Sequence, residues 1–176
     1  MFRYAGFQKP FTVAELGGGG SCFCKSLKQH FPVKEYTVFD SCPEGIAQFL
    51  RKNPEEKAIR KDLLQMQEQP QFDLVFSVGL IEHFSQVDTG QIIRKHFEMT
   101  RPGGFVIIFF PTPTLLYRIT RKTAEFLNLW QFPDERPLKP DEFRKTADQC
   151  GAFLNGYIIR SNFLSQYAAI YKKDLP

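Results

Sequence analysis

The sequence has no long hydrophobic run and few cysteines, and both shortages exclude classes of protein. Its longest apolar stretch, FVIIFF at 105–110, is far shorter than the ~20 residues that a membrane-spanning helix needs. The N-terminal segment MFRYAGFQKP lacks the apolar core of a signal peptide. The four cysteines have neither the paired spacing of a zinc site nor a secreted context for a disulfide framework. We therefore expect a reduced, cytoplasmic protein without a membrane span.

Blocks of one charge are missing as well. The net charge of +4 is mild, and the basic residues are spread along the chain, so neither nucleic acid nor a membrane surface is an expected partner. Apolar residues, in contrast, make up 43% of the chain and include 19 Phe. A chain of 176 residues with this composition can bury a substantial core. We expect a single domain over 1–176.

Strand-like and helix-like segments alternate along the chain. We expect strands at 10–17, 34–40, 57–62, 72–79 and 105–113. We expect helices at 21–31, 43–53, 86–100 and 139–151. Apolar strands separated by helices favour an α/β fold with a mostly parallel sheet covered on both faces. The last two strands, 152–161 and 165–173, are joined by so short a link that they must form an antiparallel hairpin.

Glycines and acids follow several of the expected strands. The glycine turn 17–20, Asp40, Asp62 and the segment after Gly79 each come where a strand ends. In an open α/β sheet, ligands bind at the carboxyl ends of the strands, near the point where the strand order reverses. The sequence therefore predicts that these residues line one crevice.

The glycine turn lies within VAELGGGGSCFC at 13–24 and matches no common phosphate motif. A dinucleotide fingerprint needs a final glycine where this chain has Cys22 or Phe23, and a phosphate loop needs a Gly-Lys-Ser/Thr that is absent. Glu15 would repel a pyrophosphate but suits an ammonium or sulfonium ligand. Asp40, twenty residues after Gly20, can accept hydrogen bonds from both ribose hydroxyls. Taken singly, these acids are also ordinary strand-end and turn residues.

In this combination the sequence resembles the class I S-adenosylmethionine-dependent methyltransferases, in particular their small-molecule "type 11" group. VAELGGGGS, YTVFD, IRKDLLQ and FDLVFSVGLIEHF resemble the first four motifs in order, and RPGGFVIIFFPTP resembles the segment entering the fifth strand. The resemblance covers 11–173. It implies a Rossmann-like, seven-stranded sheet with an antiparallel last strand, S-adenosyl-L-methionine as the cofactor, and methyl transfer to a small-molecule acceptor.

The resemblance also implies roles for individual residues. Glu15 would lie near the methionine ammonium of the cofactor, Asp40 at its ribose and Asp62 at the adenine amino group. The glycines would let the backbone approach the cofactor, Leu63 would offer its amide to the adenine, and Ser77 with Val78 would line the methionine end. The expected cofactor residues are thus Glu15, Gly17, Gly18, Gly19, Asp40, Ser41, Asp62, Leu63, Ser77 and Val78.

His83 is the candidate catalytic residue, because it follows the fourth strand near the expected methyl group. A neutral imidazole there can take a proton from an acceptor hydroxyl or amine. The alternative is a helix-start residue that hydrogen-bonds the backbone. Glu82 beside His83 is compatible with a metal site, but no third ligand follows at a useful spacing, so we predict no metal. His30 and His96 are expected on solvated helix faces.

The connection at 112–139 is much longer than the ~2–6 residues usual for this fold. Its middle has helical periodicity, with Leu116, Ile119, Ala124 and Leu127 forming an apolar stripe. Few residues precede the first expected strand, where relatives carry helices that cover the cofactor. We therefore expect this insertion to be a lid with acceptor contacts. The residues proposed for those contacts are Tyr117, Arg118, Trp130, Asp134 and Glu135.

Three alternatives stay open, one for the insertion and two for the function of the chain. The insertion can instead be a helix that widens the core or a dimer contact, in which case a homodimer or a partner chain covers the site. The whole chain can be a non-catalytic S-adenosylmethionine-binding subunit that needs a partner to complete its site. A nicotinamide oxidoreductase is a third possibility, disfavoured because the dinucleotide fingerprint fails.

Overall fold

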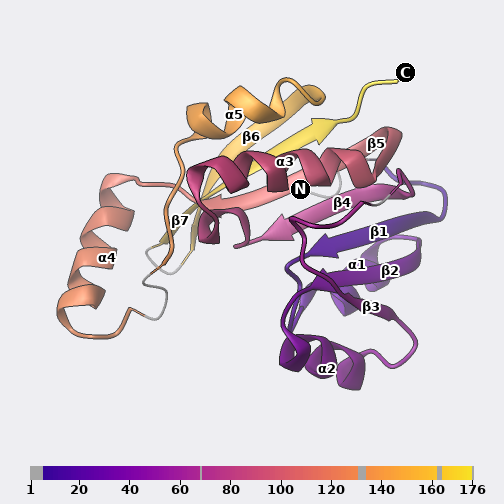
Figure 1. Cartoon of the computed structure of the whole chain (residues 1–176), viewed down its shortest axis with the longest axis horizontal. Coiled ribbons are helices and arrows are strands. Elements are labelled where there is room, and N and C mark those ends of the chain that lie inside the picture. The colour runs from indigo at the N-terminus through magenta and orange to yellow at the C-terminus, as the bar shows by residue number, and fades with distance from the viewer. Residues whose placement is uncertain (1–5, 68, 131–133, 162–163, 176) are drawn as a thin grey trace.

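The computed structural model describes residues 6–67, 69–130, 134–161 and 164–175. Within these residues a seven-stranded sheet carries helices on both faces (Figure 1). The strands are β1 (Phe11–Leu16), β2 (Val33–Asp40), β3 (Lys57–Arg60), β4 (Phe72–Val78), β5 (Thr100–Pro111), β6 (Ala152–Ser161) and β7 (Leu164–Lys172). The helices are α1 (Phe23–His30), α2 (Pro43–Lys52), α3 (Gln86–Met99), α4 (Leu115–Phe126) and α5 (Pro140–Ala147), with a short 3₁₀ turn η2 (Ile81–His83).

The strand order is β3-β2-β1-β4-β5-β7-β6, and only β7 runs antiparallel to both of its neighbours among the described strands. The other pairings are parallel. Strand order reverses between β1 and β4, which places the topological switch point there. The predicted fold, a mostly parallel Rossmann-like sheet with an antiparallel C-terminal hairpin, is confirmed.

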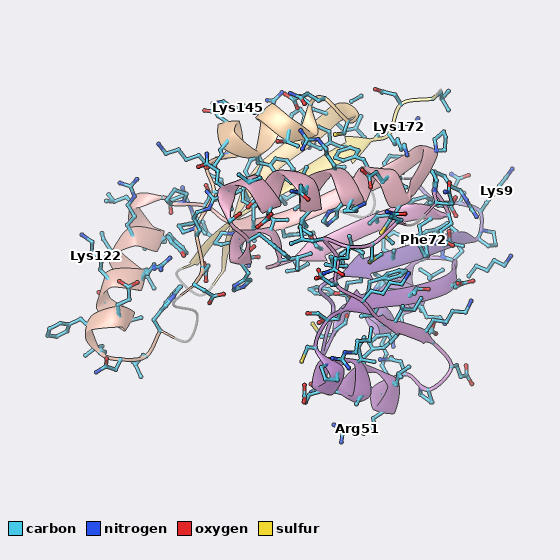
Figure 2. The ribbon with its side chains drawn as sticks, in the orientation of Figure 1. Lys9, Arg51, Phe72, Lys122, Lys145 and Lys172 are labelled. Atoms are coloured by element: carbon cyan, nitrogen blue, oxygen red, sulfur yellow. The ribbon has the colours of Figure 1, made fainter. Side chains whose placement is uncertain are left out.

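Two apolar layers hold the helices against the sheet. On one face α3 and α5 pack through Ile92, Phe97 and Phe143. On the other face α1 and α2 pack through Leu27 and Phe49. The central strands are buried on both sides, which explains their nearly continuous apolar sequences. Figure 2 shows the contrast between Phe72, inside the body of the molecule, and Lys122 and Arg51, whose side chains point outward.

Helix starts follow from local chemistry. Pro43 and Pro140 occupy the first turns of α2 and α5, where a missing N–H costs nothing. Ser85 and Thr114 cap α3 and α4, since each side-chain oxygen accepts a backbone N–H three residues on, at 3.2 Å. These caps fix where the chain turns from the strand ends into α3 and α4.

Strand β5 begins earlier than the sequence suggests. The sequence predicts this strand at 105–113, but β5 starts at Thr100, which pairs with Phe72. The ladder then slips between Phe72 and Leu74, and Gly103 has a φ of +76°. An irregularity of this kind lets the strand accommodate extra residues without ending.

The prediction for His96 is wrong. Its side chain is fully buried (0% exposed), and its ring nitrogens lie 2.8 Å from the Ile92 carbonyl oxygen and 2.8 Å from Ser77 Oγ. Burial lowers the pKa of His96 to about 4, so the ring is neutral at pH 7. His30 is exposed, as predicted.

Helix α4 confirms the helical periodicity of 112–139, but its apolar stripe does not pack on the domain. Leu116, Ile119 and Leu127 are 38%, 56% and 54% exposed. Figure 1 shows the reason, because α4 stands off from the sheet beyond the start of β7. The helix faces the domain through Tyr117, which is buried. None of the described helices is both long and apolar enough to cross a membrane.

Candidate functional site

The carboxyl ends of the parallel strands surround a cavity of about 430 Å³, here called the β2 cavity. Gly17, Asp40 and Ser41 line it from the ends of β1 and β2. Asp62 and Leu63 line it from the segment after β3. The segment after β4 contributes Gly79, Leu80, His83 and Phe84. The strand ends therefore converge on one crevice at the switch point, as the sequence predicts.

The glycine turn depends on the absence of side chains. Gly17 has a φ of +67°, and a β-carbon there would lie 2.5 Å from Leu80 Cδ1. A β-carbon on Gly45, at the start of α2, would lie 2.8 Å from Gly19 Cα. The turn thus passes between the Leu80 side chain and the backbone at the start of α2, where only glycine allows such close contacts.

Two carboxylates hold the loops around the β2 cavity. Asp40 accepts the Gly19 N–H at 2.6 Å and the Cys42 N–H at 2.8 Å, one on each oxygen. Asp62 accepts the Leu64 N–H at 3.0 Å. Each carboxylate oxygen can accept a second hydrogen bond. Both side chains therefore keep acceptor capacity toward a ligand in the cavity they line.

Glu15 lies beneath the glycine turn and does not line the β2 cavity. Its side chain is 3% exposed and accepts a hydrogen bond from the Tyr36 hydroxyl. A β-carbon on Gly18 would lie 2.8 Å from Glu15 Cδ, so the carboxylate supports the turn from below. Burial raises the pKa of Glu15 to about 7. Its contact with a cofactor ammonium stays a prediction.

Ser77 and Val78 point to opposite faces of β4. Ser77 is fully buried against α3 and hydrogen-bonded to His96, away from the described cavities. Val78 lines a second cavity. Their different surroundings follow from the alternation of side chains along a strand.

The second cavity, here called the α4 cavity, has a volume of about 470 Å³. Val78, Gly79, Glu82 and His83 line it from the end of β4 and from η2. Tyr117, Leu129, Trp130 and Glu135 line it from α4 and the segment after it. Pro111, Ser165 and Gln166 complete the lining from β5 and β7. Gly79 and His83 line both cavities, so the two spaces adjoin at the carboxyl end of β4.

Three of the five predicted acceptor residues line the α4 cavity together. Tyr117 is buried and donates its hydroxyl hydrogen to Glu135 at 2.6 Å. The Trp130 ring stands edge-on to Tyr117, with centroids 6.1 Å apart. Arg118 is exposed and does not line the cavity. Asp134 contacts His83 instead, at 2.9 Å from Nδ1.

Sequence reasoning missed Arg121, which connects α4 to the segment that follows it. Its guanidinium lies 5.2 Å from the Trp130 ring centroid and donates to the Glu135 carbonyl at 2.8 Å. Arg121 follows Tyr117 by four residues and so shares its helix face. That spacing was the available signal.

Sequence reasoning considered Glu82 only as a metal ligand. Its side chain is 3% exposed, and its Oε2 has no hydrogen-bond partner among the described residues. Burial raises the pKa of Glu82 to about 7. The Arg136 N–H donates to the Glu82 carbonyl at 2.9 Å, which holds the backbone in place. The described residues hold no group of three or more metal-ligating side chains.

Solved structures of known proteins share this arrangement of strands and helices. Magnesium protoporphyrin IX methyltransferase from Synechocystis PCC 6803, solved with bound S-adenosyl-homocysteine, is 15% identical, with a TM-score of 0.79 over 98% of this chain and 78% of that one. The N-methyltransferase NodS from Bradyrhizobium japonicum, also in complex with S-adenosyl-homocysteine, is 14% identical. Its TM-score is 0.72, and the match covers 93% of this chain and 79% of NodS. A putative methyltransferase from Haloferax volcanii, in complex with the Trm112 activator, is 12% identical. Its TM-score is 0.76, and the match covers 98% of this chain and 88% of that one.

At such identities the structural similarity shows the shared fold. A comparison with curated protein sequences finds no significant match. The family model described as "Methyltransferase domain" matches residues 13–104, which is more than half of the chain and includes the glycine turn, both carboxylates of the β2 cavity and the end of β4. This chain therefore belongs to the methyltransferase domain family and has the fold of the class I S-adenosylmethionine-dependent methyltransferases.

Proposed function

We propose that this protein transfers a methyl group from S-adenosyl-L-methionine to a small-molecule acceptor. The observation that carries the proposal is the meeting of two cavities at Gly79 and His83. One is bounded by the glycine turn and the strand-end acids, and the other is covered by α4. A methyl donor in the first and an acceptor in the second would meet where the cavities adjoin.

The residues of the β2 cavity fit the proposed cofactor. Asp40 and Asp62 keep acceptor capacity for ribose hydroxyls and an adenine amino group, and buried Leu63 offers an apolar wall and a backbone amide. Gly17, Gly18 and Gly19 form the close turn at the edge of this cavity, where β-carbons would crowd Leu80, Glu15 and Asp40. We assign Ser41 to the same binding set because it lines the cavity. Ser77, buried against His96, would act only as support.

The main task of the protein would be to align the acceptor and exclude water. When bound, S-adenosyl-L-methionine supplies a methyl group on a positively charged sulfur, which is already reactive. Positioning of the reactants can contribute roughly 7–11 kcal/mol. We propose that His83, held by Asp134, contacts the reacting groups at the junction of the cavities. We further propose that 112–139 is the lid of a single domain and that the protein is cytoplasmic.

Calorimetric titration of the purified protein tests the cofactor assignment. We expect S-adenosyl-homocysteine and S-adenosylmethionine to bind saturably, and NAD and ATP to bind at least 100-fold more weakly. Tight NAD binding without a response to either sulfur compound would contradict the proposal and favour an oxidoreductase.

The second candidate function is an S-adenosylmethionine-binding subunit that needs another chain. One observation favours it, because Leu115, Ile119 and Phe126 expose 75%, 56% and 86% of their surface on the outer side of α4. Apolar surface of this kind is typical of contacts between chains. Sedimentation velocity distinguishes the two candidates when it is combined with a methyl-transfer assay. A chain that binds S-adenosyl-homocysteine as a monomer and methylates acceptors alone would exclude the subunit.

A further inference from the structure

The charge of the α4 cavity is opposite to that of the whole chain. The chain carries a net charge of +4, yet the carboxylates of Glu82 and Glu135 line this cavity. No lysine or arginine occurs among the described residues that line it. The remaining ionisable side chains of the lining are His83 and Tyr117. The cavity is therefore suited to a cation rather than to an anion.

The two carboxylates are not equally engaged. Glu135 accepts the Tyr117 hydroxyl at 2.6 Å, and its backbone carbonyl accepts from Arg121 at 2.8 Å. Glu82 is 3% exposed, and its Oε2 has no hydrogen-bond partner among the described residues. A buried carboxylate oxygen without a donor is costly, and native proteins rarely keep one without a reason. The wall of the cavity thus contains a buried carboxylate oxygen that no described residue satisfies.

The other walls suit an apolar body. Tyr117 and Trp130 stand edge-on to each other, and Val78, Pro111 and Leu129 supply aliphatic surface. A volume of about 470 Å³ lies within the range of small-molecule pockets.

We propose that the α4 cavity binds a primary or secondary amine on an apolar or aromatic body, with Glu82 Oε2 as the group that accepts the ammonium N–H and then its proton. The inference rests on the proposed methyl transfer and names the class of acceptor for the same site. His83 lines the same cavity, but its Nδ1 lies 2.9 Å from Asp134, whereas Glu82 Oε2 has no hydrogen-bond partner among the described residues.

Methyl transfer to a bound amine begins with the loss of a proton from its ammonium form. The ammonium gives one proton to the Glu82 carboxylate, which leaves a neutral amine and a carboxylic acid. The nitrogen lone pair forms the new N–C bond to the methyl carbon, and the C–S bond breaks with its electron pair left on sulfur. The product is an N-methylammonium ion, and Glu82 returns its proton to solvent.

The protonation behaviour of Glu82 fits this role. Burial raises its pKa to about 7, while His83 lowers it and the nearby Glu135 and Asp134 raise it. A base with a pKa near the working pH is the most effective proton acceptor. An ammonium bound at Oε2 would itself favour the charged carboxylate.

Two amine and alcohol pairs of equal shape test the proposal by calorimetry on wild-type protein saturated with S-adenosyl-homocysteine. The pairs are tryptamine with tryptophol, and 2-phenylethylamine with 2-phenylethanol. We expect at least one amine to bind at least 10-fold more tightly than its alcohol at pH 7.5. Equal binding within both pairs, or no binding of either amine, would overturn the inference.

Variants then assign the preference to Glu82. Glu82→Gln keeps the shape and removes the charge, so we expect at least a 10-fold loss of amine affinity with unchanged affinity for S-adenosyl-homocysteine. Glu55→Gln, an exposed acid outside both cavities, is the matched control and should change neither. Full amine affinity in Glu82→Gln would overturn the role of Glu82. Should that variant not fold, the pH dependence of amine binding to the wild type decides, since binding through Glu82 weakens as the pH falls below 7.

Binding of S-adenosyl-homocysteine is measured first, so that a failure of the methyltransferase proposal can be told apart from a failure of the amine-acceptor proposal. Its absence would refute the methyltransferase proposal itself. Its presence without any amine preference would refute only the acceptor class.

Discussion

At the scale of single residues, Asp40 joins the glycine turn to β2 and α2. Its two oxygens accept the Gly19 and Cys42 N–H groups at 2.6 Å and 2.8 Å. Asp40→Ala removes both bonds together with the proposed ribose acceptor. Because hydrogen bonds to a charged group are worth ~1.5–3 kcal/mol, we expect S-adenosyl-homocysteine to bind roughly 10- to 100-fold more weakly.

Calorimetry measures this loss, and circular dichroism checks that the variant stays folded. Asp40 is only partly buried, so the domain should persist. Unchanged affinity for S-adenosyl-homocysteine would mean that Asp40 only stabilises the turn and does not bind the cofactor.

The glycine turn has a second residue-level test with its own control. Gly17→Ala is strained for two reasons. The backbone at this position has a φ of +67°, and the new β-carbon would lie 2.5 Å from Leu80 Cδ1. We expect a loss of stability of ~1–2 kcal/mol and weaker binding of S-adenosyl-homocysteine, because left-handed backbone is costly for alanine. In Gly20→Ala the new β-carbon would meet only the end of the Gln48 side chain, which can move. Thermal unfolding and calorimetry should therefore separate the two variants, and equal behaviour would contradict the assigned geometry.

At the scale of elements, α4 covers one cavity and leaves the other to the strand ends. Its inner face contributes Tyr117 to the α4 cavity, and no residue of α4 lines the β2 cavity. The helix can therefore be removed without touching the proposed cofactor contacts. Arg136 and Leu138 must stay, because Arg136 pairs with Glu142 and Leu138 is fully buried.

Replacement of 115–134 by a short glycine linker tests the lid. We expect S-adenosyl-homocysteine affinity within about 3-fold of wild type, and loss of methyl transfer to the acceptor. Ile119→Thr, on the exposed side of α4, is the control and should keep full activity. Full transfer by the trimmed protein would mean that another segment or chain covers the acceptor.

At the scale of the whole molecule, buried ionisable groups make stability depend on pH. Burial raises the pKa of Glu15 from its ordinary value of 4.5 in the unfolded chain to about 7 in the folded protein. Its contribution to stability is therefore present below pH 4.5 and is lost as the pH rises through 7. His96 acts in the opposite sense, because its pKa falls from 6.5 to about 4 on folding. Its contribution is present above pH 6.5 and is lost as the pH falls toward 4.

The variant Glu15→Gln isolates one of these effects. We expect the free energy of unfolding of the variant, relative to wild type, to rise by roughly 3 kcal/mol between pH 4 and pH 8. Urea denaturation of ligand-free protein at several pH values measures the difference. Glu55→Gln, at an exposed position, should show no such trend. A constant difference for Glu15→Gln would show that burial does not shift its titration.

The sequence by itself determined the order of the elements, the antiparallel hairpin and the meeting of Gly17, Asp40 and Asp62 at one edge. Apolar periodicity and strand length are local properties, and parallel strands necessarily bring their carboxyl ends together. Resemblance to a family then supplied the expected cofactor for that edge.

Only the tertiary structure decided which side chains face which space. His96 and Ser77 meet inside the core because α3 packs over β4. The apolar stripe of α4 faces outward because the helix stands beyond the sheet rather than on it. Glu82 is a buried hydrogen-bond acceptor in the wall of the α4 cavity because η2 turns its side chain inward, while its neighbour His83 stays exposed. The surroundings of a side chain depend on elements far away in the chain, which local periodicity does not encode.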